Sequence, residues 1–529
     1  MNTISHRLFK NSSMIATANV LTLLIGFAAL PIVIHFIGLS LYGVWVIVFG
    51  LVTMLAIFDF GVGGTFVTQL SMALARHDTR QARQILTLSV IFYLALAALF
   101  SPLLYFLVPS LPLWLHIAPR FWHAVKPLIP WLYLFVFLSQ AFSAFTSLAA
   151  ADQRFAFVSI LGVLGQLTNS GLLILLLIFH LGLPSFIIAL YASWVIPTLA
   201  YIVLSLRILK QWPFTIPWPL PRPLIVQLAS FSGWLQINRI SNQITNEIDR
   251  ILIGIYVSPA AAGVFQIAYR ITRVAKSFPG SLTGAILPVI SHWEATDNHD
   301  RIRQSFRDAS RYMVALTFFL GVFFWSSERV IFHFWLEHHY QGEFIAMALL
   351  TVTVVVNSLT AIGTTILRGI GKPRLESYYA ILNALAKIAI SLSLAARFKL
   401  PGILLGTVLG TTLGSFYFLW LFFRYMDMTW GEGLWSWVRP IVIVSALSGI
   451  ATNILTKQVP LPPGRPGSLV LTAAFGIFYT VIYAYGLNLF GFYRESSDVE
   501  RLTQILPRPL LIIGQRLHVL PRLSHTAHI

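Results

Sequence analysis

Charged residues inside long apolar stretches carry the most evident chemistry of this sequence. Between residues 225 and 291 they are Arg239, Glu247, Asp249, Arg250, Arg270, Arg273 and Lys276. One helical face would carry the residues spaced i, i+4, i+7 and i+11, which are Arg239, Gln243, Asn246 and Arg250. Arginine binds phosphate through two parallel N–H groups. The pattern therefore indicates a surface that binds an anion.

Lys387 lies in a third apolar stretch, about ten residues from either end, which is too deep for its ammonium group to reach water easily. We expect it to line the same anion-binding surface. Glu247 and Asp249 leave an alternative open, because they would neutralise Arg250 and a neighbour in structural ion pairs. No acidic residue is close in sequence to three of the cations, which are Arg270, Arg273 and Lys276.

Glycine-rich interruptions break two of the apolar stretches. The first is Asp59 followed by three glycines, and the second is Pro279-Gly280. Glycine adopts backbone conformations that other residues avoid, so we expect hinges at Gly61, Gly63, Gly64 and Gly280. Three acids are candidates for a coupling-ion site or a hinge lock: Asp59, Glu247 and Asp249. For Asp59 the alternative is a cap on a helix that restarts at Gly61.

Motifs for other kinds of chemistry are absent from the sequence. It has no cysteine, and it contains neither a zinc-binding nor a nucleotide-binding motif nor a nucleophile elbow. We therefore expect no catalytic residue, no metal site and no cofactor. The histidines are not spaced as metal ligands.

Composition indicates which elements must position these residues. Of the 529 residues, 57% are hydrophobic and 10% are charged, whereas a soluble domain has about 25% charged residues. A membrane span needs about 20 apolar residues. We predict an all-α polytopic membrane protein with about 14 spans, at 12–37, 43–75, 85–108, 127–150, 156–179, 186–206, 225–256, 263–291, 312–333, 344–367, 377–396, 402–423, 438–456 and 468–490.

The basic residues predict how these spans are oriented. With a cytoplasmic N-terminus, the inner segments hold 23 of the 36 lysines and arginines and the outer loops hold six. Cytoplasmic loops carry the excess of basic residues in membrane proteins. We therefore expect both termini in the cytoplasm. The net charge of +18 is explained by this orientation, and we expect no nucleic acid as a partner.

An internal repeat predicts two lobes. Residues of the second and eighth spans match at a constant offset of 220, as in Gly43 with Gly263 and Gly64 with Gly284. Both spans are also interrupted at the same relative place, which is typical of secondary transporters. We expect six-helix lobes at 1–210 and 222–430, related by a pseudo-two-fold repeat. Two additional spans at 431–490 and a basic cytoplasmic tail at 491–529 would follow.

Several motifs of this sequence resemble those of a known family. The runs at 36–45 and 58–63, with Asp249-Arg250-Ile251-Leu252-Ile253-Gly254, are similar to the lobe openings of polysaccharide-biosynthesis and O-antigen flippases. These flippases belong to the multidrug/oligosaccharidyl-lipid/polysaccharide exporter superfamily. The final pair of spans departs from the twelve that are common in O-antigen members.

The resemblance implies a function. A member would translocate a polyprenyl-pyrophosphate oligosaccharide across the bacterial inner membrane by alternating access, for assembly of surface polysaccharide such as lipopolysaccharide or exopolysaccharide. The cations would then contact the pyrophosphate. Membrane lipids and other glycan-assembly membrane proteins would be the remaining partners.

Two other functions stay open. A cation-coupled multidrug exporter of the same superfamily would need an acidic or aromatic cavity, and the cations argue against it. A polytopic glycan polymerase or ligase would need catalytic residues on a sizeable external loop. The longest predicted outer loop, at 109–126, has about 18 residues and no acid. We therefore expect a transporter and not an enzyme.

Overall fold

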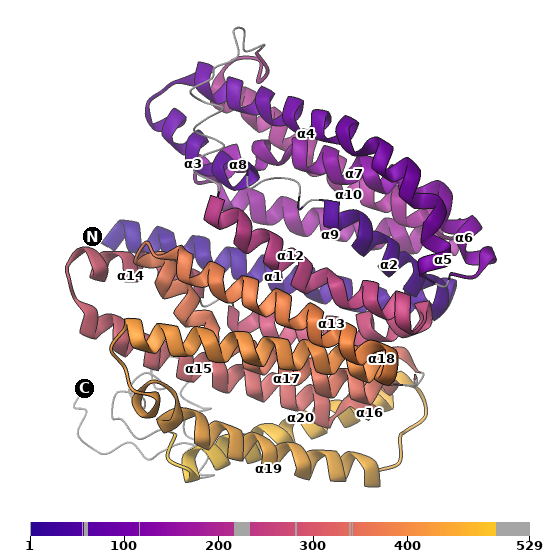
Figure 1. The fold of residues 1–529 in the computed structure, drawn as a ribbon, viewed down its shortest axis with the longest axis vertical. Helices are drawn as coiled ribbons and strands as arrows, with labels where there is room; N and C mark the ends of the chain where they lie inside the picture. The colour runs from indigo at the N-terminus through magenta and orange to yellow at the C-terminus, as the bar shows by residue number, and fades with distance from the viewer. Residues whose placement is uncertain are drawn as a thin grey trace. The chain divides into compact units, whose positions relative to one another are not determined.

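The protein is α-helical throughout the part that the structure describes, with no strand in it (Figure 1). The computed structural model describes residues 2–55, 57, 62–115, 117–215, 233–280, 283–337, 340 and 342–492. In the N-terminal half the helices are α1 (Asn2–Ile37), α2 (Leu39–Met54), α3 (Val62–Ala75), α4 (Thr79–Leu107), α5 (Leu111–Trp114), α6 (Pro119–Val125), α7 (Ile129–Ala141), α8 (Ser143–Ala151), α9 (Phe155–Ile178) and α10 (Pro184–Leu209).

The C-terminal half continues in the same way. Its helices are α12 (Gly233–Tyr256), α13 (Pro259–Gly280), α14 (Thr283–Ala295), α15 (His299–Ser326), α16 (Glu328–Leu336), α17 (Glu343–Gly369), α18 (Pro373–Tyr425), α19 (Ser436–Gln458) and α20 (Gly464–Leu489). A short π-helix at Gly431–Trp435 leads into α19. The prediction of an all-α polytopic membrane protein is confirmed.

Each predicted span coincides with a helix, an arm of a helix or a broken pair of helices. Ten segments of the described chain are long and apolar enough to cross a membrane. One of them, α18, consists of two arms, because Lys399 has non-helical backbone angles of φ 51° and ψ −129°. The remaining predicted spans correspond to α2 with α3, to α12 and to α13 with α14, which are interrupted or carry more charge. The number of 14 spans therefore stays a prediction.

Both predicted interruptions fall at helix ends. Helix α2 ends at Met54 and α3 begins at Val62, so that Gly63 and Gly64 lie in the first turn of α3. Asp59 and Gly61 lie outside the described residues. Helix α13 ends at Gly280, and α14 begins three residues later. Their roles as hinges or as a coupling-ion site stay predictions.

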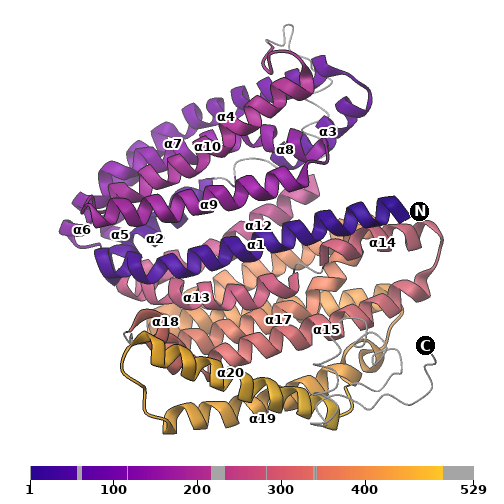
Figure 2. The same ribbon diagram turned by 180° about the vertical axis from the view of Figure 1, so that it is seen from behind.

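The chain divides into two compact units. The first comprises Met1–Arg270 and Lys372–Gly414, and the second comprises Ile271–Gly371 and Ser415–Ile529. In the first unit, α9 packs between α1 and α10, α4 packs on α7, and α2 packs on α12 (Figures 1 and 2). In the second, α15 packs against α17 and α19, and α16 packs against α20. The units do not follow the lobe boundaries at 210 and 222, and the lobes stay a prediction.

Glycines allow close helix packing in the first unit. A side chain at Gly43 would collide with the backbone carbonyl of Pro259, where α2 meets the start of α13. Along the hairpin made by the arms of α18, a Cβ atom at Gly410 would lie 2.5 Å from Cα of Lys387. Small residues of this kind let helix backbones approach closely in membranes. The second arm therefore packs directly over the segment that carries Lys387.

Candidate functional site

Lys387 is held in a buried ion pair with Asp249. Its Nζ atom donates to Oδ2 of Asp249 at 2.7 Å and to the backbone oxygen of Thr245 at 2.6 Å. The hydroxyl of Thr407 donates to the other carboxylate oxygen of Asp249, also at 2.7 Å. Asp249 is 4% exposed and Lys387 is 2% exposed. The pair therefore connects α12 to both arms of α18.

Arg250 is paired in the same region. Its Nη1 atom lies 2.9 Å from Oε2 of Glu247, one helical turn away, and its guanidinium lies 5.9 Å from the ring centre of Tyr269. A Cβ atom added to Gly50 on α2 would lie 2.6 Å from Cδ of Arg250, so glycine leaves the space that the pair occupies. This geometry fits the alternative in which Glu247 neutralises Arg250 structurally.

The other side chains that we predicted to bind the anion are less buried. Arg270 is half-buried and donates from Nη1 to the backbone oxygen of Gly26 on α1 at 2.8 Å. Arg273 and Lys276 are exposed on the last turns of α13. Gln243 donates to the backbone oxygen of Thr53 at 3.4 Å. Two further residues of the predicted face are exposed, Arg239 and Asn246.

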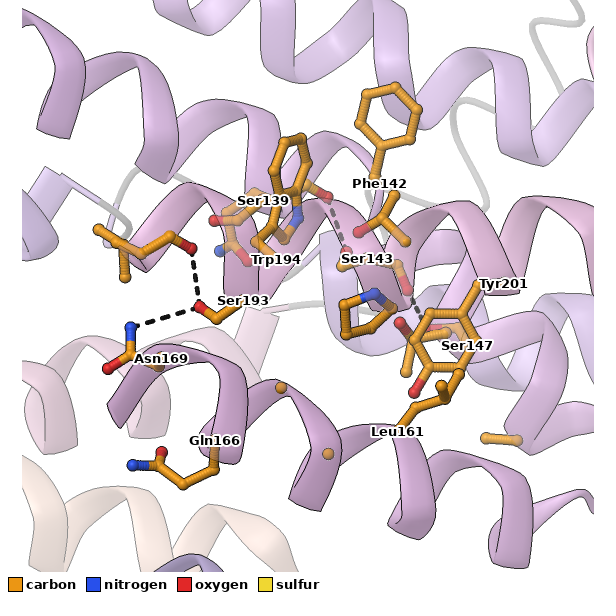
Figure 3. Close-up of a pocket in the computed structure, with 18 of the residues that line it drawn as sticks. Ser139, Phe142, Ser143, Ser147, Leu161, Gln166, Asn169, Ser193, Trp194 and Tyr201 are labelled. Atoms are coloured by element: carbon orange, nitrogen blue, oxygen red, sulfur yellow. Dashed lines mark hydrogen bonds between the residues drawn. The ribbon is translucent and has the colours of Figure 1, made fainter. Parts of the chain in front are cut away.

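A cavity of about 880 Å³ opens within the first unit, between α7, α8, α9 and α10 (Figure 3). Arg239 of α12 also lines it. Its polar and aromatic lining residues are Ser139, Gln140, Phe142, Ser143, Thr146, Ser147, Gln166, Asn169, Ser193, Trp194, Thr198 and Tyr201. Arg239 is the one charged residue among the described residues that line it. The predicted cations are therefore not gathered here, and only Arg239 takes part.

Hydrogen bonds orient part of this wall. The Asn169 amide donates to the hydroxyl of Ser193 at 3.4 Å, from α9 to α10, and the Ser193 hydroxyl donates to the backbone of its own helix at 2.7 Å (Figure 3). The Gln166 amide donates to Ser170 at 3.0 Å. The carbonyl oxygens of both amides and the faces of the aromatic rings can therefore serve a ligand.

Polar residues at helical spacing are the sequence signal for this cavity. Gln140, Gln166 and Asn169 are single polar residues in apolar stretches, and such residues often bond to a neighbouring helix, as Asn169 does. However, Ser139, Ser143 and Ser147 recur at helical spacing, as do Gly162, Gly165, Gln166 and Asn169. Such polar stripes on consecutive spans could have located the cavity. No such sequence pattern predicts the hydrogen bond of Thr407 with Asp249.

A metal site has no support in the described part of the chain, which holds no group of three or more histidine, aspartate or glutamate side chains placed to bind an ion. The adjacent pair His338-His339 lies outside the described residues.

Comparison with solved structures shows the fold that positions this cavity. The lipid II flippase MurJ in an inward closed conformation matches 90% of this chain and 98% of its own, at a TM-score of 0.64 and 14% identity. The eukaryotic MATE transporter AtDTX14 matches 85% of this chain and 98% of its own, at a TM-score of 0.59 and 15% identity. Likeness at these identities concerns the fold alone.

Sequence comparison identifies the family. A probable low-salt glycan biosynthesis flippase of Haloferax volcanii, Agl15, is 20% identical over 236 residues, which are 43% of this chain and about half, 48%, of that relative. The MatE family matches residues 236–392. The family described as polysaccharide biosynthesis protein matches residues 8–294, more than half of the chain. This chain is therefore a member of the polysaccharide biosynthesis protein family.

Proposed function

We propose that this protein is a flippase that translocates a lipid-linked oligosaccharide, carried on polyprenyl pyrophosphate, across the bacterial cytoplasmic membrane for surface polysaccharide assembly. The observation that carries the proposal is the cavity of the first unit, with its neutral polar wall, aromatic rings and one arginine. A glycosyl pyrophosphate has the matching parts, because its sugars are neutral and polar and its anion lies at one end. Family membership and the name of the Haloferax relative support the same substrate class.

Different side chains of the cavity would bind different parts of the substrate. Hydroxyl and amide groups of Ser193, Asn169 and Gln166 match the hydroxyl groups of a sugar, and the faces of Trp194 and Tyr201 match its apolar ring faces. Arg239 is the residue that we propose to contact the pyrophosphate, since guanidinium binds phosphate bidentately. Arg270, Arg273 and Lys276 would be further candidates for contact with the pyrophosphate, at about 10 to 20 Å from the predicted outer end of their span.

Arg250 and Lys387 would act differently. Each forms an ion pair with an acid inside the first unit, so we propose that they hold helices in place. The interruptions at Gly61, Gly63, Gly64 and Gly280 would then allow the bending that alternating access requires. Both termini would be cytoplasmic, as the distribution of basic residues predicts.

A multidrug exporter for organic cations is less well supported. Such a cargo would be attracted by carboxylates, and no acidic residue is among the described residues that line the cavity. A glycan polymerase or ligase would need acid and base groups at a reacting bond, and the described residues that line this wall include no carboxylate and no histidine.

The test is translocation of a fluorescent polyprenyl-pyrophosphate oligosaccharide by the full-length protein in proteoliposomes. We expect Arg239→Gln to lower the initial rate at least tenfold, because it removes the one charge among the described residues that line the cavity, and Arg239→Lys to restore part of it. The matched control is Arg154→Gln, an exposed loop arginine that pairs with Asp152 at 2.7 Å. Unchanged translocation by Arg239→Gln, or no translocation by the unaltered protein, would contradict the proposal.

A further inference from the structure

The ammonium group of Lys387 binds to oxygen atoms of the kind that also bind inorganic cations. Thr245 and Asp249, at i and i+4 on one face of α12, supply oxygen atoms at 2.6 and 2.7 Å from its Nζ atom. Thr407, on the second arm of α18, donates its hydroxyl to the other carboxylate oxygen at 2.7 Å. Carboxylate and carbonyl oxygens are the ligands that hard inorganic cations prefer in proteins. The ammonium group therefore lies in a position whose chemistry also suits a metal cation.

A further oxygen atom lies on the same face of the first arm of α18. Asn383 is one helical turn before Lys387 and is 6% exposed. Its side-chain carbonyl oxygen is buried and accepts no hydrogen bond from the described residues. A buried oxygen without a donor is costly, whereas a carbonyl oxygen beside a cation is stabilised. The first arm thus has a neutral ligand to spare within one turn of the ammonium group.

Close backbone packing would keep this position open if the lysine side chain were shorter. A Cβ atom on Gly410 would lie 2.5 Å from Cα of Lys387, and one on Gly406 would lie 2.5 Å from Cα of Ser391. The backbones of the two arms of α18 are therefore already in contact, and they cannot move closer to fill a space. Shortening a buried side chain in such surroundings leaves a cavity. Here the carboxylate of Asp249 would line it.

We infer that Asp249, Thr245 and Thr407 form a site for a monovalent cation, and that the ammonium group of Lys387 fills it in place of a dissolved ion such as Na⁺. Asp249 is 4% exposed and lies in a predicted span, where an uncompensated carboxylate is costly. A cation must therefore stay beside it. Lys387 supplies that cation by covalent attachment, so the cation cannot leave the protein as a free ion can.

An attached cation and a dissolved one differ in their effect on stability. With Lys387 in place, α12 stays joined to both arms of α18 at any concentration of Na⁺. With its side chain removed, the site should accept Na⁺, and stability should rise with the concentration of the ion, because a ligand that binds only the folded state stabilises it by mass action. The inference concerns the first unit alone and does not depend on the cargo or on the sugar cavity.

Thermal unfolding of the purified full-length protein in detergent tests the site, in sodium chloride and in choline chloride at equal concentration. Choline is too large to replace the ammonium group beside Asp249. We expect the unfolding temperature of Lys387→Ala to be several degrees higher in sodium chloride, and that of the unaltered protein to be the same in both salts. Equal unfolding temperatures of Lys387→Ala in the two salts overturn the inference. A response of the unaltered protein to Na⁺ that Asp249→Asn abolishes also overturns it, because the ion would then bind beside the lysine.

Three variants separate a bound ion from a general effect of salt. Lys387→Met removes the same charge but fills the space, so Na⁺ should not raise its unfolding temperature. Lys387→Ala combined with Asp249→Asn lacks the carboxylate and should not respond either. Lys126→Ala is the matched control at an exposed lysine of the same unit. A response to Na⁺ as large as that of Lys387→Ala in any of these variants overturns the inference.

Lys387→Asn keeps the test decisive if Lys387→Ala does not fold. Its amide oxygen adds a neutral ligand, and its shorter side chain leaves space for the ion. Its unfolding temperature should also be several degrees higher in sodium chloride than in choline chloride, and the absence of a difference overturns the inference.

Discussion

Two regions of the first compact unit differ in the kind of polar side chain that they contain. Where α12 meets α18, full charges are buried and paired, as in Asp249 with Lys387 at 2.7 Å. Between α7, α8, α9 and α10, the described wall of the cavity is neutral except for Arg239. A buried charge is stable only with a partner, whereas neutral hydroxyl and amide groups can face an open space. The difference supports our proposal that the paired charges position helices and that the neutral wall binds a ligand.

The largest expected effect follows from breaking the Asp249 pair. Lys387→Met leaves a carboxylate 4% exposed without its cation, which we expect to cost about 3–5 kcal/mol of unfolding free energy. Thermal unfolding of the purified protein in detergent would measure the loss. Combining Lys387→Met with Asp249→Asn should recover most of it, since no charge is then stranded. If the double variant were as unstable as the single one, the ion pair would not be the reason.

A smaller effect is expected at the neighbouring pair. Arg250→Gln removes the cation that pairs with Glu247, whose side chain is 13% exposed, and we expect a loss of about 1–3 kcal/mol of unfolding free energy. Adding Glu247→Gln should restore thermal stability and translocation together, because the pair is proposed to be structural. Restored stability without translocation would instead assign Arg250 to the pyrophosphate, and would weaken the contrast between the two regions.

The smallest effect on stability is expected in the cavity wall. Gln166→Leu should leave the unfolding temperature within a few degrees of the unaltered protein while lowering glycan translocation about tenfold, which corresponds to about 1.4 kcal/mol of lost binding. Gln458→Leu, at the exposed end of α19, is the matched control. Equal translocation by the two variants would show that the neutral wall does not contact the cargo.

Local sequence patterns were enough to predict the helical elements. Runs of about 20 apolar residues identify a helix by length and hydropathy alone, and the positions of the helices agree with those runs. Glycine and proline marked the interruptions after Met54 and Gly280 because these residues alter the backbone itself. The charged residues inside the spans were visible for the same reason, since each is conspicuous among apolar neighbours.

Only the tertiary structure decided which of these residues meet. Lys387 and Asp249 are 138 positions apart. The sequence predicted that Lys387 lines an anion-binding surface, and the structure shows it in an ion pair with Asp249. Helical periodicity states which residues share a face, but not which face of another helix lies opposite. The cavity has the same origin, since its polar stripes on α7 to α10 become a wall only when four helices pack around a common space. Composition determined that the chain is a bundle of membrane helices, and packing determined which polar groups are paired and which remain open to a ligand.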